Sequence, residues 1–271
     1  MKPCLSEATT MAASFAEDVS AYAEASVNAM EVWLTKLEEH LRQHSPDETR
    51  RLLADNQMSL AAASYQGGLL LSQGEERRTH YDQFQRRLGL CQEFGIGTLL
   101  IVPDVAERVG AVGLERAHVS LRQSSQLAAS YGVRLALEFR SSASWCASLS
   151  TAVALVAGCQ EPNLGVAFDV FHYYTGPSKF EDLQLLNGSN CGFVQLSDLA
   201  GVPREFAADA DRILPGDGDF QLKPILQRLR EVGYEGWVSV ELMNPELWKM
   251  KPVAVANAAW KAVRRLLGGS Q

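Results

Sequence analysis

The stretch between residues 97 and 139 decides the fold. It contains two short apolar runs, GTLLIVP (97–103) and VRLALEF (133–139), with the length and composition of buried strands. Between them, LERAHVSLRQSSQLAASYG (114–132) carries apolar residues at helical spacing. A strand, a helix and a second strand in succession are typical of parallel strands joined by a right-handed crossover. This stretch therefore predicts one unit of a parallel sheet covered by helices.

Copies of this unit fill the chain. The other predicted strands are residues 2–8, 27–33, 59–65, 164–170, 192–198 and 237–243. Helical patterns separate them, and the glycine-rich fingerprint that an open dinucleotide-binding sheet carries after its first strand is missing. Eight strand–helix units in 271 residues predict a single (β/α)8 TIM barrel, with residues 1–271 as one domain.

Composition and charge narrow the class of protein. The chain is 46% hydrophobic and 21% charged, which is typical of a soluble globular protein, and we expect neither a membrane span nor a signal peptide. Five scattered cysteines without a C-x-x-C pair indicate reduced thiols and a cytoplasmic protein. A net charge of −7 argues against a nucleic-acid partner, so we expect a small-molecule ligand.

Polar side chains end each of the last four predicted strands. They are Glu138, Asp169, Gln195 with Asp198 close behind, and Glu241. Because the active site of such a barrel lies at these ends, the carboxylates are expected to meet, and a bound cation relieves their repulsion. Three carboxylates and an amide oxygen suit Mn²⁺ or Mg²⁺. The alternative is that each acid pairs with a nearby Arg or Lys; for three acids together we favour the metal.

Five segments carry a resemblance to a known family. They are LALEFR (135–140), VAFDVFHYY (166–174), VQLSD (194–198), DADRILPGDGDF (209–220) and GWVSVELMNPELWK (236–249). Together they resemble the xylose isomerase-like TIM-barrel superfamily of sugar isomerases and epimerases, and within it the 2-keto-myo-inositol isomerases and keto-sugar 3-epimerases.

The resemblance implies one divalent metal ion. Its ligands would be Glu138, Asp169 and Glu241, with Gln195 at the place that a histidine usually holds. Because an amide oxygen is a hard, neutral ligand, we expect a preference for Mn²⁺ or Mg²⁺, with Zn²⁺ or Co²⁺ also compatible. The resemblance also implies that Glu138 and Glu241 are the catalytic pair. One removes the proton next to a carbonyl and the other returns a proton, through an enediolate.

The same resemblance implies several contacts with the substrate. His172 would touch the substrate, and Arg204 and Arg212 lie on a long loop that helps to shape the site in the family. For His172 the alternative is a structural hydrogen bond. For Arg212 the alternative is an ion pair with Asp209 or Asp211 that holds the loop in place.

Earlier strand ends add residues that could line the pocket. Trp33 and Tyr65 could bind the apolar face of a sugar ring, although each could equally be packing. Glu31 and Asp104 also lie at the ends of earlier predicted strands and could line the pocket as well. Trp248 could cap the site or serve a subunit contact, so a homo-oligomer is compatible with the sequence.

The function expected from these residues is a divalent-metal-dependent isomerase or epimerase of a keto-sugar or keto-cyclitol (an inosose). A second hypothesis is a dehydratase or lyase that acts on a keto-cyclitol or 3-keto-glycoside with the same metal and glutamates. A third is a non-catalytic carbohydrate-binding barrel that lost catalysis together with the histidine. The retained acids and His172 argue against this last hypothesis.

Overall fold

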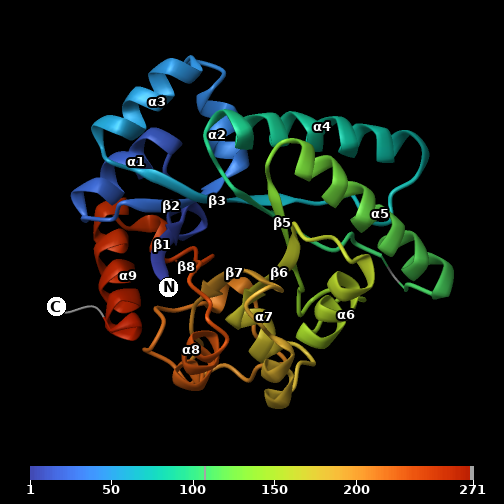
Figure 1. Cartoon of the computed structure of the whole chain (residues 1–271). Coiled ribbons are helices and arrows are strands. Elements are labelled where there is room, and N and C mark those ends of the chain that lie inside the picture. Colours follow the sequence, from blue (N-terminus) through green and yellow to red (C-terminus); the bar gives the residue numbers. More distant parts are fainter. Residues whose placement is uncertain (107, 269–271) are drawn as a thin grey trace.

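The computed structural model, which describes residues 1–106 and 108–268, is a closed barrel of parallel strands in chain order (Figure 1). The strands are β1 (Lys2–Ser6), β2 (Ala29–Trp33), β3 (Ser59–Gln66), β4 (Thr98–Ile101), β5 (Arg134–Glu138), β6 (Leu164–Asp169), β7 (Cys191–Leu196) and β8 (Trp237–Val240). The (β/α)8 barrel predicted from the sequence is therefore confirmed. The last strand is shorter than predicted, so Glu241 directly follows β8.

Helices surround the strands on the outside of the barrel (Figure 1). They are α1 (Phe15–Glu24), α2 (Leu34–His40), α3 (Pro46–Asp55), α4 (Gly74–Glu93), α5 (Ala111–Ser130), α6 (Leu149–Cys159), α7 (Val170–Thr175), α8 (Leu222–Glu231) and α9 (Pro252–Leu267). Short 3-10 helices are η1 (Glu7–Thr10), η2 (Phe180–Leu185), η3 (Asp209–Asp211) and η4 (Leu247–Lys249). Reciprocal capping boxes begin α1 and α3, where Ser14 pairs with Glu17 and Ser45 with Glu48.

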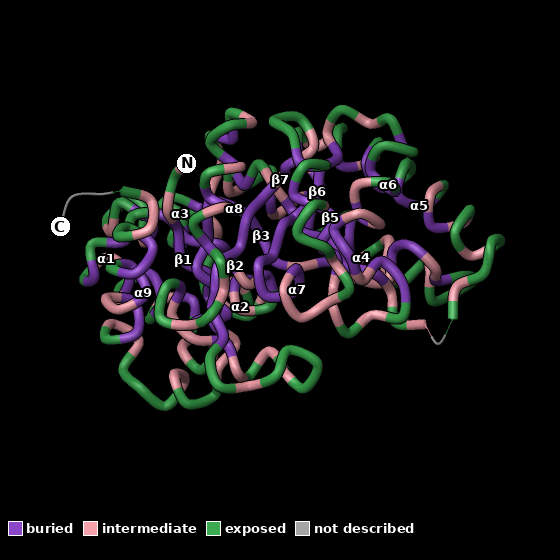
Figure 2. The backbone as a smooth tube through the Cα atoms, turned by 90° about the horizontal axis from the view of Figure 1, so that it is seen from below, coloured by how far each residue is buried: buried purple, intermediate pink, exposed green. Residues whose placement is uncertain are grey.

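The apolar core has two parts. Leu, Val, Ile and Phe side chains between the strands and the helices form the larger part, and the buried strands run through its centre in Figure 2. A smaller inner cluster fills the barrel itself and consists of Cys4, Ala29, Ala61, Ala62, Leu100, Ala136, Ala167 and Phe193. Small residues dominate this inner cluster because the space inside an eight-stranded barrel holds only layers of side chains.

The inner cluster also indicates which side chains face the barrel interior near the carboxyl ends of the strands. Side chains alternate along a strand, so the residue two positions after an inner-cluster residue points inward as well. Glu138 follows Ala136 by two residues, and Asp169 follows Ala167 by two. Gln195, Glu31 and Ser64 stand in the same relation to inner-cluster residues of their own strands. A polar layer therefore lies directly above the apolar one.

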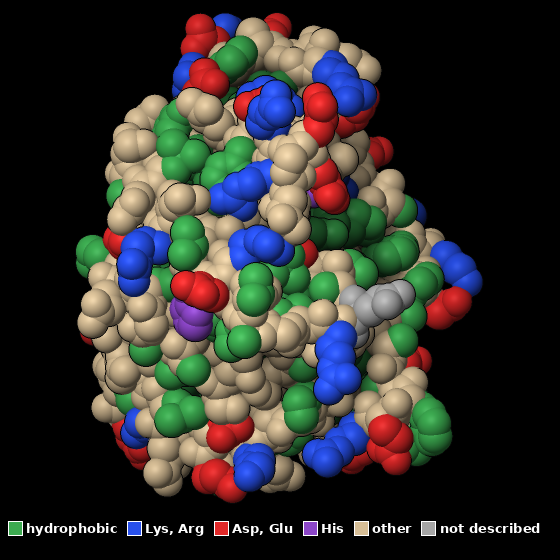
Figure 3. All heavy atoms as spheres, turned by 90° about the vertical axis from the view of Figure 1, so that its right-hand side faces the viewer, with side chains coloured by type: hydrophobic (Ala, Val, Ile, Leu, Met, Phe, Trp, Pro, Cys, Tyr) green, Lys and Arg blue, Asp and Glu red, His purple; other side chains and the backbone are tan. Residues whose placement is uncertain are grey.

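The surface and the cysteines agree with the composition. On the face drawn in Figure 3, basic and acidic side chains are interspersed rather than gathered into one basic stripe. All five cysteines are buried and unpaired. Within the described part of the chain, we find no helix with the length and apolar character needed to cross a bilayer.

Candidate active site and metal centre

Strand register brings the predicted strand-end residues to one level of the barrel. Asp169 on β6 lies opposite Gln195 on β7, and Gln195 lies opposite Ser239 on β8. On the other side, Glu138 at the end of β5 lies opposite Ala167 of β6. All the polar side chains of this set are buried, as is Glu241 after β8.

A compact group of donors forms where β5 and β6 end. Donor atoms of Glu138, Asp169 and His172 all lie within 4.8 Å of one another. His172 Nε2 is 3.2 Å from Glu138 Oε1 and 3.7 Å from Asp169 Oδ2. The other ring nitrogen, Nδ1, is 3.1 Å from Ser141 Oγ. The structure thus adds His172, assigned to the substrate by the sequence, to the side chains that could hold a metal. In the sequence, the Asp-x-x-His spacing of Asp169 and His172 is the feature that could have indicated this pairing.

Arg212 reaches this group from the loop after β7. Its side chain is fully buried, and Nη2 donates to Asp169 Oδ2 at 2.7 Å. Nη1 is 3.3 Å from Glu241 Oε2. Nη2 also donates to Asp209 Oδ1 at 2.7 Å, so the loop-holding ion pair offered as the alternative is present. Arg212 therefore holds the loop and also enters the site.

Arg140 is a residue of the site that sequence reasoning missed. Its guanidinium lies 3.8 Å from Glu138 Oε1 and 3.9 Å from Asp209 Oδ2. The same guanidinium stands over the ring of Tyr65, 5.7 Å from its centre. Arg140 comes two residues after Glu138, but no pattern in the sequence distinguishes it from an exposed arginine at the end of a strand.

The two glutamates assigned to catalysis have opposite electrostatic surroundings. Burial alone would raise the pKa of Glu138, but Arg140 and the hydrogen bond from His172 outweigh burial and lower it. Burial raises the pKa of Glu241 well above its usual range, and Arg212 offsets this only in part. Two nearby carboxyl groups with diverging pKa values form an arrangement suited to moving a proton from one position to another.

The charges of the site leave room for a cation. Among the described residues, four carboxylates (Glu138, Asp169, Asp209 and Glu241) share two guanidinium groups, those of Arg140 and Arg212. Acids thus outnumber arginines, so the two guanidinium groups can neutralise at most two of the four carboxylates. A divalent cation would offset the remainder. The donor set of carboxylate, amide and imidazole groups fits such an ion.

Gln195, which lies opposite Asp169 on the neighbouring strand, has a buried side-chain oxygen without a partner. Its Nε2 donates to Glu31 Oε1 at 2.9 Å, whereas its Oε1 is buried and has no hydrogen-bond partner in residues 1–106 and 108–268. A buried carbonyl oxygen without a partner is unfavourable by about 1–3 kcal/mol, and a bound cation would satisfy it. Gln195 therefore fits the role of an oxygen ligand that the sequence suggests.

Other residues singled out in the sequence lie at varying distances from this group. Trp33 and Tyr65 contact each other edge to face, with ring centres 5.3 Å apart, and line a cleft of ≈250 Å³. Arg204 is exposed, and within the described residues no hydrogen bond or ion pair joins its side chain to the carboxylates. Its role stays a prediction.

Two acids near the site hold loops. Asp104 accepts hydrogen bonds from the backbone N–H groups of the segment 70–72. Asp198 accepts from Leu199, Gly216 and Phe220. A Cβ on Gly218 would lie 2.4 Å from Asp198 Oδ1, so only glycine permits this close approach.

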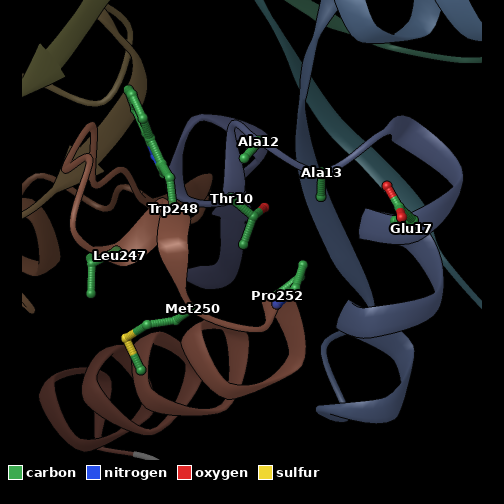
Figure 4. A pocket seen from close by; sticks show the side chains of 8 residues that line it. All are labelled: Thr10, Ala12, Ala13, Glu17, Leu247, Trp248, Met250 and Pro252. Carbon is green, nitrogen blue, oxygen red and sulfur yellow. The ribbon is translucent and has the colours of Figure 1, made fainter.

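Trp248 borders a separate hollow of ≈220 Å³ (Figure 4). Its lining residues come from the segment around η1 and α1 and from the segment around η4 and α9. Trp248 Nε1 donates to the carbonyl of Ala8 at 2.9 Å. The lining includes none of the strand-end acids, so Trp248 belongs to the packing of the two chain ends rather than to the polar layer.

Comparison with known proteins adds independent information. The family model described as xylose isomerase-like TIM barrel matches residues 19–266. An inosose isomerase from Bacillus licheniformis is 28% identical over 258 residues, which cover 92% of each chain. A 3-dehydroshikimate dehydratase from Pseudomonas aeruginosa is 28% identical over 87% of this chain, but over only 37% of that longer protein.

A solved structure agrees over nearly the full length. The crystal structure of IOLI protein with a binding zinc atom is 26% identical, has a TM-score of 0.90, and covers 99% of this chain and 98% of its own. The family match spans most of the barrel, including every strand from β2 to β8. This chain is a member of the xylose isomerase-like TIM barrel family.

Proposed function

We propose that this protein is a divalent-metal-dependent isomerase of keto-cyclitols (inososes), which moves a proton next to the substrate carbonyl. The observation that carries the proposal is the convergence of Glu138, Asp169 and His172 within 4.8 Å, beside more carboxylates than the neighbouring arginines can pair. The similarity to inosose isomerases over 92% of both chains supports this substrate class.

The side chains proposed to hold the ion are Glu138, Asp169, Gln195 and Glu241, with His172 close enough to join them. When bound, the ion would polarise the carbonyl and stabilise the negative charge that develops on its oxygen. Hard oxygen donors lead us to expect Mn²⁺ or Mg²⁺, although the related IOLI structure holds zinc.

Glu138 and Glu241 are proposed to transfer the proton. Glu138 is the last residue of β5 and Glu241 follows β8. These strands are separated around the closed barrel by β6 and β7, so the two carboxylates reach the centre from different directions. Such a pair can remove a proton on one side of a carbon and return one on another.

The remaining polar groups are proposed to bind the hydroxyls of the ring. His172 and Arg212 border the carboxylates directly, and Arg140 joins them from the other side. Tyr65 lies under Arg140 and Trp33 against Tyr65, which together would form an aromatic wall. Arg204, on the exposed loop, is proposed to contact only the outer part of the substrate.

A second candidate is a dehydratase of the same kind of substrate. The similarity to 3-dehydroshikimate dehydratases favours it, and the reaction would begin with the same proton removal. The two functions differ in the product, because only the dehydratase releases water. Similarity over 92% of the inosose isomerase, against 37% of the dehydratase, leads us to rank the isomerase first.

The test is incubation of the purified protein with a panel of inososes and keto-sugars in D₂O with Mn²⁺, followed by NMR. We expect deuterium to enter at a carbon next to the carbonyl of an inosose and an isomeric inosose to form. A product that has lost water would instead indicate the dehydratase. Binding of a sugar with no exchange in any substrate would support a carbohydrate-binding barrel and contradict the proposal.

A further inference from the structure

Glu31 is a buried carboxylate to which the proposed reaction gives no role. It lies on β2, in the half of the barrel opposite the strand-end acids, and its side chain is fully buried. Alternation along β2 points it into the barrel, two residues after Ala29 of the inner cluster. A carboxylate inside the barrel requires hydrogen-bonding partners, because burying a charged group without them is unfavourable in free energy.

Two side chains on other strands donate hydrogen bonds to Glu31. Gln195 Nε2, on β7, donates to Glu31 Oε1 at 2.9 Å. Ser64 Oγ, on β3, donates to the same oxygen. Because one carboxylate oxygen accepts both hydrogen bonds, the amide of Gln195 must present its NH₂ group, and not its oxygen, to Glu31.

This contact decides where the amide oxygen points. The two ends of a glutamine amide are nearly equal in shape, so packing alone does not choose between its two orientations. While Glu31 is ionised, a reversed amide would place Gln195 Oε1 against a carboxylate oxygen of Glu31, with no proton between them. In the observed orientation, Oε1 faces away from Glu31, is buried, and has no hydrogen-bond partner among the residues that the structure describes.

We propose that Glu31, assisted by Ser64, is a positioning residue that fixes the amide of Gln195 with its oxygen toward the cation. The inference rests on the proposed function, because it concerns one of the ligands named there. Carboxylates that accept a hydrogen bond from a metal-ligating side chain, and so orient it, are a general feature of metal sites. Their loss typically weakens metal binding by about 10- to 100-fold.

A double-mutant cycle on the full chain tests this inference without any activity assay. Mn²⁺ is titrated by calorimetry into EDTA-treated wild type, Glu31→Gln, Gln195→Leu and the double variant. We expect Glu31→Gln to weaken Mn²⁺ binding about tenfold or more, because its own amide NH₂ can donate to Gln195 and allows the reversed orientation. In the Gln195→Leu background, the same substitution should change the affinity less than about twofold.

A matched control is Glu7→Gln. Glu7 is also a fully buried glutamate, but it follows β1, and its Oε2 accepts from the backbone N–H of Trp33 at 2.7 Å. This substitution should leave the Mn²⁺ affinity within about twofold of the wild type. If Glu31→Gln does not fold, Ser64→Ala takes its place in the cycle, and it should weaken binding only when Gln195 is present.

The outcomes separate this inference from the proposed function. Equal weakening by Glu31→Gln with and without Gln195 would mean that Glu31 acts only through its charge, and it would overturn the positioning role. Unchanged affinity in Glu31→Gln would overturn it as well. Neither result touches the metal site itself. Absence of Mn²⁺ binding by the wild type would contradict the proposed function and the inference together.

Discussion

The barrel opening has two halves, formed by the ends of β1 to β4 and by the ends of β5 to β8. Both halves carry acids, but most of the acids in one half have different partners from those in the other. In the first half, Glu7 accepts a hydrogen bond from the backbone of Trp33, and Asp104 accepts several from the segment 70–72. In the second half, Glu138 and Glu241 face imidazole and guanidinium groups. Asp169 does both, since Oδ1 accepts from Phe171 N–H while Oδ2 faces Arg212.

The difference teaches that a strand-end position alone does not identify a functional acid. A carboxylate whose oxygens accept backbone N–H groups holds a loop in place, and its position is explained by that loop. A carboxylate that meets other charged side chains in a buried space needs a further explanation, which a cation and a substrate provide. Glu31 is the exception in the first half, because it reaches across the barrel to Gln195. Asp198 is the exception in the second half, because it accepts backbone N–H groups of its own loop.

The largest expected effect concerns the glutamates of the second half. Glu138→Gln or Glu241→Gln should lower the rate of deuterium exchange into an inosose by about 10²- to 10⁴-fold, because each variant loses a group that accepts or donates a proton. The exchange is followed by NMR in D₂O. Retention of more than a tenth of the wild-type rate in either variant would remove that residue from the catalytic pair.

Glu31 should change the pH dependence of stability. Burial raises its pKa from 4.5 to about 7, so the folded protein binds this proton more tightly than the unfolded chain does. The stability that this proton contributes is present below pH 4.5 and is lost as the pH rises through 7. In the metal-free protein, Glu31→Gln should therefore gain stability relative to the wild type across this window, by at most about 3 kcal/mol.

Urea unfolding of both proteins at several pH values measures this difference. The expected result is two stability curves that diverge as the pH rises from about 4.5 to 7. Parallel curves would show that Glu31 titrates alike in the folded and unfolded protein.

Asp104→Ala tests the comparison at an acid of the first half, which should contribute to stability and not to metal binding. The substitution leaves three backbone N–H groups of the segment 70–72 without their acceptor, so the free energy of unfolding should fall by about 1–3 kcal/mol. Calorimetry should find the Mn²⁺ affinity unchanged. Loss of metal binding with little loss of stability would place Asp104 in the site and end the distinction between the halves.

Gln195→His should have the smallest effect. An imidazole is a better ligand than an amide for zinc, so Zn²⁺ should gain about tenfold over Mn²⁺ in competition binding. Glu31 could still accept the second ring N–H, as carboxylates do in histidine metal sites. An unchanged Zn²⁺-to-Mn²⁺ ratio would place residue 195 outside the ligand set.

The sequence was informative where local periodicity decides the outcome. The positions of Glu138, Asp169 and Gln195 at the ends of predicted strands indicated that they would meet, and the eight-fold recurrence of strand and helix predicted the barrel. The position of Arg212 depends on the path of a long loop. Hydrogen bonds from the backbone N–H groups of Gly216 and Phe220 to Asp198 hold that loop. The contact of Gln195 with Glu31 joins residues 164 positions apart, and depends on which strands face each other across the barrel. No local pattern encodes such contacts.

Direct titration of Mn²⁺ into EDTA-treated wild type and Asp169→Asn tests the central claim, that the second half of the barrel opening is a metal site. Calorimetry should find one ion per chain in the wild type and an affinity lower by at least about a hundredfold in Asp169→Asn, which loses a buried carboxylate ligand. No binding by the wild type, or equal affinities in the two proteins, would contradict the claim.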